Sequence, residues 1–337
     1  MHLTALSGGI GGARFLRGLL THLDDDTRRT GRRHALTTVV NTADDMWMFG
    51  LRVCPDLDTV MYTLGGGIDD DRGWGRADES WQAKAELAAY GVEPSWFGLG
   101  DRDLATHLVR TQMLGAGYPL SAVTAALADR WRPPYDTEVR LLPMSDDRAE
   151  THVVVDDETS PAGRRAVHFQ EYWVRMRAAV PAREVVVVGQ AEATPAPGVL
   201  DAIATADVLL MPPSNPVVSV GTILGVPGVR AAIAGAAAPV VGLSPVVGGR
   251  AVRGMADAVL AAVGVDPTAD AVAAHYGARA AGGLLDGWLV DSSDKGSVEV
   301  VEAGGIVCRS VPLLMTDVPA AAAMAAEALD LAREVGR

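Results

Sequence analysis

The sequence HLTALSGGIGGAR, residues 2–14, joins a short apolar segment to a run of glycines. Its apolar part, residues 2–6, predicts a β-strand, and residues 13–22 predict a helix that follows the glycines. A second apolar segment, residues 36–40, predicts the next strand, and the polar sequence NTADD follows it at residues 41–45. Strand, glycine loop, helix and strand at this spacing predict a βαβ unit and therefore a parallel sheet.

The next part of the chain has the pattern of helices rather than strands. Asp78, Asp101 and Ser121 each stand where a side chain can cap a helix. The helices predicted to follow these caps cover residues 78–90, 101–114 and 121–131. We predict that residues 61–135 form a helical insertion against a core made of residues 1–60 and 136–337.

Strand and helix signals alternate again in the second half of the chain. The run Val185–Val188 is continuously apolar, which is typical of a buried parallel strand. The predicted strands cover residues 139–142, 151–155, 184–188, 208–211, 240–243 and 284–290. The predicted helices cover residues 197–206, 220–224, 251–263 and 320–334, and the last of them, rich in alanine, is expected to be a surface helix. The fold class expected from this order is α/β, with a Rossmann-like parallel sheet core and a helical insertion.

Composition excludes several classes of protein. The net charge is −13 and no basic tract is present, which argues against a nucleic-acid-binding surface. No apolar run reaches the roughly 18 residues of a membrane span. The N-terminus lacks the basic and apolar regions of a signal peptide, so we expect a cytoplasmic protein without a membrane partner. Cys54 and Cys308 are expected to be buried thiols.

The glycine run predicts a site for an anion. Glycines after a first strand allow close approach of a ligand, and the following helix presents free N–H groups to phosphate. Neither common fingerprint fits, because Arg14 stands where the last glycine of G-x-G-x-x-G is required, and G-x-x-x-x-G-K-[ST] is absent. This spacing argues against a nicotinamide dehydrogenase. A tight strand-to-helix turn without a ligand is the structural alternative.

Four carboxylates follow the second predicted strand. Asp44 and Asp45 end the sequence NTADD, and Asp56 and Asp58 lie in CPDLDT at residues 54–59. Carboxylates gathered at the carboxyl edge of a sheet, near phosphate, commonly hold Mg²⁺. Helix caps and turns are the alternative role of such residues. The apolar sequence MWMF at residues 46–49 beside the group favours a ligand site.

Three more polar segments could each form part of a ligand site or only a turn or helix cap. They are GDRDLATH at residues 100–107, MPPSNPVVSVG at residues 211–221 and LSPVVGGR at residues 243–250. The second and third follow predicted strands, so their Ser, Asn and free N–H groups are placed to bind a phosphate or a nucleoside. Each alone is compatible with ordinary loop chemistry, but several such loops at one sheet edge support one another.

Taken in order, these motifs resemble the 2-phospho-L-lactate transferase family, whose actinobacterial members are phosphoenolpyruvate transferases of coenzyme F-420 biosynthesis. The resemblance spans nearly the whole chain. Its motifs lie at residues 7–14, 41–45, 55–59, 100–107, 142–147, 213–216 and 244–249.

The resemblance implies a fold, a reaction and partners. It implies a Rossmann-like core whose helical insertion covers the acceptor site, and a homodimer. The donor would be linked to guanosine diphosphate (GDP), the cofactor would be Mg²⁺, and the acceptor would be the deazaflavin 7,8-didemethyl-8-hydroxy-5-deazariboflavin (Fo). Attack by its ribityl alcohol would release GMP and form a coenzyme F-420-0 precursor.

A related family is the alternative. Its members bind nucleotide sugars, act in morphology control and typically carry D-D-G-G-S-S-G-R in the second motif. Here Asp44 and Asp45 are followed by residues 46–49, MWMF. An aromatic patch suits stacking on a flat deazaflavin ring, which favours the transferase over a regulatory binding protein.

Site residues follow from these motifs. Metal binding is assigned to Asp45 and Asp58, with Asp44 as a third ligand, and Asp45 or Asp58 is also the candidate catalytic base. Substrate binding is assigned to Ser7, Gly8, Gly9, Gly11, Gly12, Asn41, Met46, Trp47, Thr59, Arg102, Pro213, Ser214, Asn215 and Ser244. Lysine occurs only at Lys84 and Lys295, which suggests a GC-rich, actinobacterial source and therefore an enolpyruvyl rather than a lactyl donor.

Overall fold

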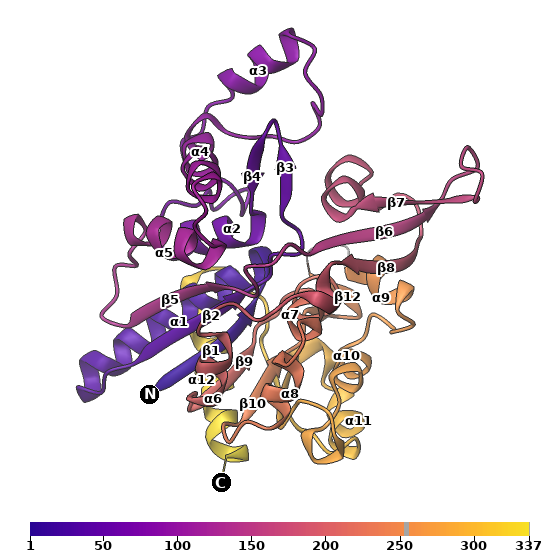
Figure 1. Ribbon diagram of the computed structural model, residues 1–337. Coiled ribbons are helices and arrows are strands. Elements are labelled where there is room, and N and C mark those ends of the chain that lie inside the picture. The colour runs from indigo at the N-terminus through magenta and orange to yellow at the C-terminus, as the bar shows by residue number, and fades with distance from the viewer. Residues whose placement is uncertain (253–255, 337) are drawn as a thin grey trace.

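The computed structural model describes residues 1–252 and 256–336. Within these residues a seven-stranded sheet forms the centre of the molecule, and all its neighbouring strands run parallel (Figure 1). In spatial order its strands are β14 (Val307–Val311), β13 (Gly287–Asp291), β10 (Val240–Leu243), β9 (Val208–Met211), β1 (His2–Ser7), β2 (Ala35–Val40) and β5 (Glu138–Pro143). The predicted α/β class with a Rossmann-like parallel core is confirmed.

The strand order reverses direction between β1 and β9. From β1 the chain proceeds outward through β2 to β5, and from β9 it proceeds the other way through β10 and β13 to β14. Leu3 of β1 pairs with Leu36 of β2 on one side and with Val208 of β9 on the other. Open parallel sheets bind ligands outside the carboxyl ends of their strands at such a reversal. The loops after β1 and β9 are therefore the expected walls of a site.

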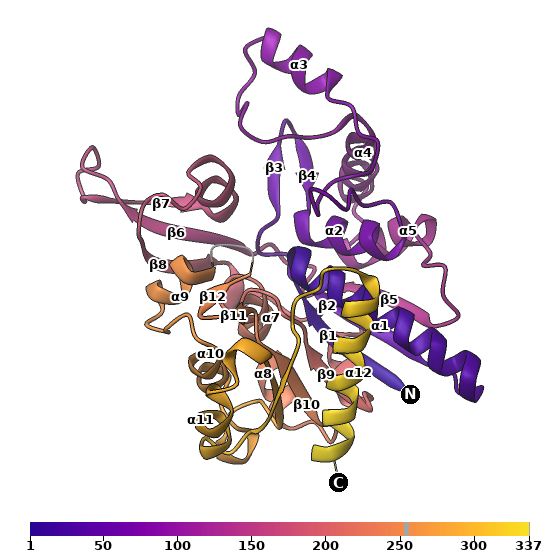
Figure 2. The same ribbon diagram turned by 180° about the vertical axis from the view of Figure 1, so that it is seen from behind.

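Helices cover both faces of this sheet, because successive strand residues point to opposite sides. In β9, Leu209 belongs to the core formed with helices on one face, and Leu210 belongs to the core on the other. The first face carries α6 (Val199–Ala204), α7 (Val220–Gly225), α8 (Val229–Ala234), α10 (Ala269–Tyr276) and α11 (Ser297–Ala303). Figure 2 shows α1 (Gly9–Thr30) and α12 (Val318–Val335) side by side on the second face.

Two of these helices differ from their predictions in ways that matter for the site. The first begins at Gly9 and not at Ala13, so the glycine run forms its first turn. The last was predicted as a surface helix, but residues such as Met324 and Leu329 are buried against the sheet. A Cβ at Gly18 of α1 would lie closer than 3.0 Å to the backbone of Ala321, so this glycine lets the two helices pack closely. No helix among the described residues is long and apolar enough to cross a membrane.

Helices and a hairpin lie between β2 and β5. The hairpin joins β3 (Met46–Met48) and β4 (Leu51–Val53), and the helices are α2 (Pro55–Leu64), α3 (Gln82–Ala89), α4 (Asp101–Gly115) and α5 (Leu120–Arg130). The predicted caps of α3 and α4 are wrong. The Asp101 carboxylate accepts the N–H groups of Gln82 and Ala83, and so caps α3 instead of Asp78. Glu79 in turn accepts the N–H group of Arg102 and caps α4.

A separate antiparallel sheet, here called the side sheet, contains three of the strands described by the structure. Its order is β7 (Arg164–His168), β6 (Glu150–Asp156) and β8 (Ala182–Val188). The prediction that Val185–Val188 is a buried parallel strand is wrong, because Val186 is 37% exposed and Val188 is 56% exposed. An apolar run of this length fits a half-buried antiparallel strand equally well. The helix predicted over residues 251–263 is observed as α9 (Ala256–Ala262), and residues 253–255 lie outside the described part.

Candidate functional site

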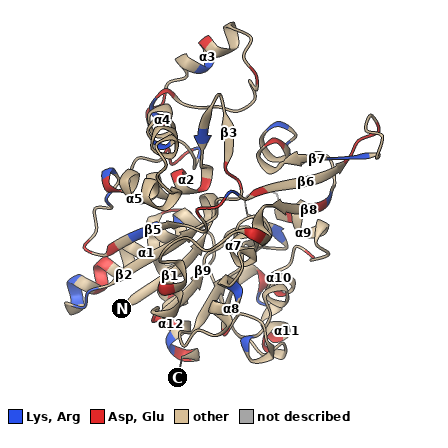
Figure 3. Cartoon of the chain, viewed as in Figure 1, with Lys and Arg blue, Asp and Glu red and all other residues tan. Residues whose placement is uncertain are grey.

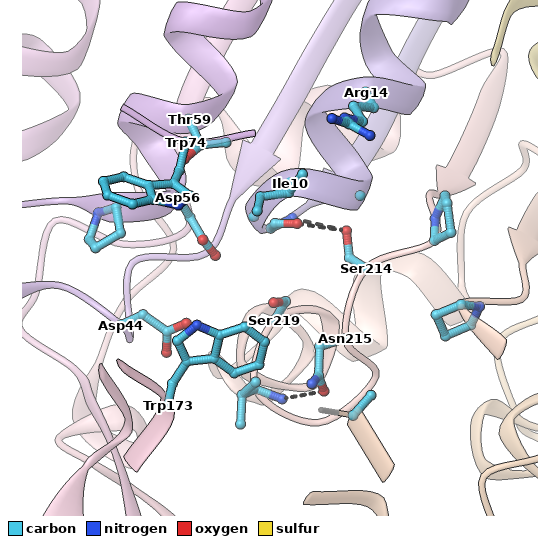
Figure 4. Close-up of a pocket in the computed structure, with 18 of the residues that line it drawn as sticks. Ile10, Arg14, Asp44, Asp56, Thr59, Trp74, Trp173, Ser214, Asn215 and Ser219 are labelled. Carbon is cyan, nitrogen blue, oxygen red and sulfur yellow. Dashed lines mark hydrogen bonds between the residues drawn. The ribbon is translucent and has the colours of Figure 1, made fainter. Parts of the chain in front are cut away.

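A cavity of about 500 Å³ lies at the carboxyl edge of the central sheet, where the strand order reverses. Its lining residues lie in the loops after β1, β2, β9, β10 and β14, in α1 and α2, in the segment between α2 and α4, and in the segment after β7 of the side sheet. Figure 4 shows most of these side chains. The lining residues used below are Gly8, Gly9, Gly11, Arg14, Asp44, Asp56, Thr59, Arg72, Trp74, Phe97, Phe169, Trp173, Pro213, Ser214, Asn215, Ser219, Ser244, Pro245, Leu313 and Met315.

The amino end of α1 faces this cavity. Gly8 is extended, and Gly9 begins the helix with a φ of 57°, a left-handed conformation that glycine adopts without strain. The first N–H groups of a helix have no partner inside it and carry the positive end of the helix dipole. Ser7 is fully buried behind this turn. The arrangement is suited to an anion such as a phosphate.

The loop after β9 is held against this turn by one serine. The Oγ atom of Ser214 accepts the N–H group of Gly8 at 3.2 Å and donates to the Gly8 carbonyl oxygen at 2.9 Å. The Oδ1 atom of Asn215 accepts the N–H groups of Val217 and Val218 at 2.9 and 3.2 Å. This fixes the Asn215 amide at the cavity wall, with its NH₂ group as the remaining donor (Figure 4).

The glycines have a second purpose besides ligand approach. A Cβ at Gly11 would lie closer than 3.0 Å to the carbonyl oxygen of Pro213, and a Cβ at Gly8 would lie 2.5 Å from the Cβ of Ser219. At Gly12 the added atom would meet the hydroxyl groups of Ser7 and Ser214. These glycines therefore make room for the protein's own loops, which brings the β9 loop against the helix.

Asp44 and Asp56 are the carboxylates that line the cavity. They are 3% and 7% exposed. Asn41 lies behind them, donating from Nδ2 to Asp56 at 3.0 Å and accepting from the N–H of Ala43 and the hydroxyl of Thr222. Within the described chain, Oδ1 of Asp44 has no hydrogen-bond partner. Burial raises the pKa of Asp56 to about 7, and burial together with the charges of Asp56 and Asp45 raises the pKa of Asp44 well above its usual range.

The remaining two carboxylates of the group are neutralised by arginines. Asp45 is fully buried and pairs with Nη2 of Arg52 at 3.2 Å. Asp58 on α2 accepts both Nη atoms of Arg110 on α4, with Nη1 at 3.0 Å from Oδ2. Neither carboxylate belongs to the described lining of the cavity. Figure 3 shows the acidic residues at the start of α2.

Asp58 also belongs to a group that could hold a metal ion. One ligand atom each of Asp58, Asp103 and His107 lies within 4.8 Å of the others. The Nε2 atom of His107 lies 3.3 Å from Asp103, and the hydroxyl of Tyr62 donates to Asp103 at 2.7 Å. The motif at residues 100–107 is compatible with a capped helix or with a functional segment, and the i, i+4 spacing of Asp103 and His107 places both side chains on one helix face.

Aromatic side chains form the wall opposite the glycine turn. Trp173 belongs to a π-helical turn of Glu171–Arg175, which follows the side-sheet strand β7. Trp74 lies between α2 and α3, with the guanidinium of Arg72 5.4 Å from its ring centre. Phe97 and Phe169 complete this wall. Single π-helical turns are frequently found at functional sites.

Sequence analysis did not select Asp56, Trp74 or Trp173. Asp56 stands in the motif at residues 54–59 and was available there, whereas Trp173 follows a strand that was not predicted. Of the residues assigned to substrate binding, those that line the cavity are Gly8, Gly9, Gly11, Thr59, Pro213, Ser214, Asn215 and Ser244.

Three residues that were also assigned to substrate binding lie outside this lining. Trp47 is 50% exposed on the β3–β4 hairpin, and Met46 packs with Met48, Val53 and Leu99. Arg102 is on α4, where it donates to the carbonyl oxygen of Ala77. None of these three belongs to the described lining of the cavity, so their assignment stays a prediction.

The fold and the cavity together define an α/β protein whose cavity combines a helix amino end suited to an anion, two buried carboxylates and an aromatic wall. Residues 3–304 match the family model described as 2-phospho-L-lactate transferase CofD. The chain therefore belongs to the 2-phospho-L-lactate transferase family and is an enzyme, a transferase, as the sequence motifs predicted.

Individual members of the family match this chain over almost their whole length. The chain is 65% identical to the phosphoenolpyruvate transferase of Streptomyces griseus over 335 residues, which cover 99% of each protein. It is 67% identical to the phosphoenolpyruvate transferase of Streptomyces avermitilis, with the same coverage. Among solved structures, the protein BH3568 of Bacillus halodurans matches with a TM-score of 0.61 and 17% identity, covering 97% of this chain and 99% of that one. At that identity the likeness supports the fold alone.

Proposed function

We propose that the enzyme transfers a phosphoenolpyruvyl group from a GDP-linked donor to the ribityl alcohol of the deazaflavin Fo, releasing GMP and forming dehydro coenzyme F-420-0. One observation carries this proposal. A single cavity joins a helix amino end suited to phosphate, a carboxylate pair that forms no ion pair among the described residues, and an aromatic wall. The names of the relatives, phosphoenolpyruvate transferase, support the enolpyruvyl over the lactyl group.

The donor is proposed to lie along the carboxyl edge of the sheet. Its diphosphate would occupy the turn at Gly8–Gly11 and the loop at Pro213–Asn215, where N–H groups and the Asn215 amide are available. The guanosine would extend towards the β10 and β14 side, where Ser244, Pro245 and Met315 form the wall. Arg14 lines the cavity between these regions and offers positive charge to the phosphates.

The residues of the site fit a magnesium ion. Asp44 and Asp56 are buried carboxylates close enough for the charge of Asp56 to raise the pKa of Asp44, and Asp44 has an unpartnered oxygen at the cavity. Mg²⁺ prefers carboxylate oxygens together with water and substrate phosphate. We propose that Asp44 and Asp56 would hold it, where it would neutralise charge on the diphosphate. The earlier assignment to Asp45 and Asp58 places the ion on carboxylates that already pair with arginines.

The acceptor is proposed to bind at the aromatic wall. Its flat ring would lie against Trp74 and Trp173, since aromatic faces stack favourably. The ribityl chain would then reach the carboxylate pair and the diphosphate, as the common cavity permits. The alcohol oxygen forms a bond to the phosphorus that carries the enolpyruvyl group, and the bond from that phosphorus to GMP breaks. The alcohol proton is proposed to pass to the carboxylate pair of Asp44 and Asp56.

A direct assay tests this function. The protein is incubated with Fo, Mg²⁺ and either the enolpyruvyl or the lactyl donor, and GMP release is followed. Mass spectrometry of the product distinguishes the donors, because the dehydro product is lighter by the mass of H₂. We expect GMP release with a preference for the enolpyruvyl donor. Absence of GMP release with either donor would contradict the proposed function, and a lactyl preference would contradict only the donor. We also propose a homodimer, which light scattering in solution tests.

A further inference from the structure

Arg52 and Arg110 form ion pairs with two of the four carboxylates near the cavity. The guanidinium of Arg52 pairs with Asp45, and both side chains are less than a tenth exposed. Arg110, with its side chain 2% exposed, forms the bidentate pair with Asp58. Asp44 and Asp56 have no such cation partner among the hydrogen bonds and ion pairs of the described residues. Two carboxylates are thus paired with guanidinium groups within the protein, and two line the cavity without such a pair.

The two arginines form one connected network behind the site. Nη1 of Arg110 donates to the backbone carbonyl oxygen of Arg52 at 3.4 Å and approaches Nδ1 of His107 at 3.2 Å. The N–H of Arg52 donates to the hydroxyl of Thr111 at 2.8 Å. Because Asp58 lies on the first turn of α2, this network joins α4 and the β3–β4 hairpin to the helix that carries Asp56. The arginines therefore hold both halves of the carboxylate group in place.

We propose that Arg52 and Arg110 are positioning residues for a divalent cation: by pairing with Asp45 and Asp58, they leave Asp44 and Asp56 as its ligands. The role of that cation in catalysis rests on the proposed function, but its binding does not require substrate. A cation at Asp44 and Asp56 is attracted by the pair and repelled by the nearby guanidinium groups. Removal of one guanidinium charge strengthens cation binding, whereas mere loosening of the fold weakens it. The sign of the change separates the two roles.

The test is a titration of the full-length protein with Mn²⁺ alone, in which electron paramagnetic resonance measures the free ion. For the unchanged protein we expect one Mn²⁺ per chain, displaced by Mg²⁺. Asp44→Asn and Asp56→Asn should weaken binding at least about tenfold, since each removes a ligand charge. Asp45→Asn should weaken it less than either, because Asp45 contributes a nearby charge but no ligand atom. Arg52→Gln should tighten binding roughly tenfold, and Arg52→Lys, which keeps the charge, should leave it near the original value.

A matched control is available far from the site. Arg279 pairs with Asp286 at 2.6 Å outside the cavity, so Arg279→Gln removes an ion pair and should leave Mn²⁺ binding unchanged. If Arg52→Gln fails to fold, the comparison of Asp44→Asn with Asp45→Asn still decides which carboxylates hold the cation, and weaker Mn²⁺ binding in Arg110→Met would overturn the role of the guanidinium charge. Loss of Mn²⁺ binding in Asp45→Asn or in His107→Gln, with binding retained in Asp44→Asn, would overturn it. The expected Mn²⁺ pattern without any GMP release would instead refute the proposed function and leave the cation site standing.

Discussion

Replacement of Gly11 by alanine tests how the site is built. The new methyl group would lie closer than 3.0 Å to the carbonyl oxygen of Pro213, which belongs to the backbone and cannot rotate away. The β9 loop or the first turn of α1 must therefore move. Overpacking of this kind costs about 1–3 kcal/mol, and the gain from alanine in a helix offsets roughly 0.5–1 kcal/mol of it. We expect the free energy of unfolding to fall by about 1–2 kcal/mol, which corresponds to a fall in Tm of about 2–5 °C for a chain of this size.

Thermal and urea unfolding measure the stability change, and titration with GDP measures the effect on the proposed donor site. Because Gly8 and Ser214 are hydrogen-bonded to each other, a displaced β9 loop should also weaken GDP binding. Gly115, at the end of α4, is the matched control, since a Cβ there meets nothing within 4 Å. Gly115→Ala should be as stable as the original protein or more stable. Unchanged stability and unchanged GDP binding in Gly11→Ala would refute the packing argument.

Three further predictions follow from named contacts. Asn41→Ala should lower the free energy of unfolding by about 1–3 kcal/mol, because it leaves buried hydrogen-bond partners unsatisfied. It should also lower turnover, because Asp56 loses the hydrogen bond from Asn41; chemical unfolding measures the first effect and GMP release the second. Trp173→Ala should raise the KM for Fo about 2- to 12-fold, because stacking contributes roughly 0.5–1.5 kcal/mol, whereas Trp47→Ala should leave this KM unchanged. If steady-state kinetics show the larger effect for Trp47→Ala, the acceptor binds at Trp47 instead. Arg110→Met should cost about 3–5 kcal/mol of stability, because it leaves a buried carboxylate unpaired, and a urea midpoint equal to that of the original protein would contradict this.

Local pattern accounts for the first βαβ unit of the fold. The apolar segments at residues 2–6 and 36–40, with glycines between strand and helix, require no distant partner to be interpreted, and both strands were found in parallel pairing. The valine run at residues 185–188 shows where local pattern is insufficient. These valines lie in β8, which pairs with β6 in the side sheet and not with a strand of the buried central sheet. This pairing leaves alternate valines, Val186 and Val188, exposed.

For the site, the sequence alone determined the family, through motifs in a set order, and determined that glycine, carboxylate and loop residues gather at one sheet edge. Only the tertiary structure decided which carboxylates are free to act. Asp45 and Asp58 look the same as Asp44 and Asp56 in the sequence, but Arg110 comes from 52 residues further along the chain to pair with Asp58. The cavity wall is decided in the same way, because Trp173 reaches it on a π-helical turn and Trp47 does not belong to its described lining. Charge compensation and burial depend on distances through space, and those distances exist only once the chain has folded.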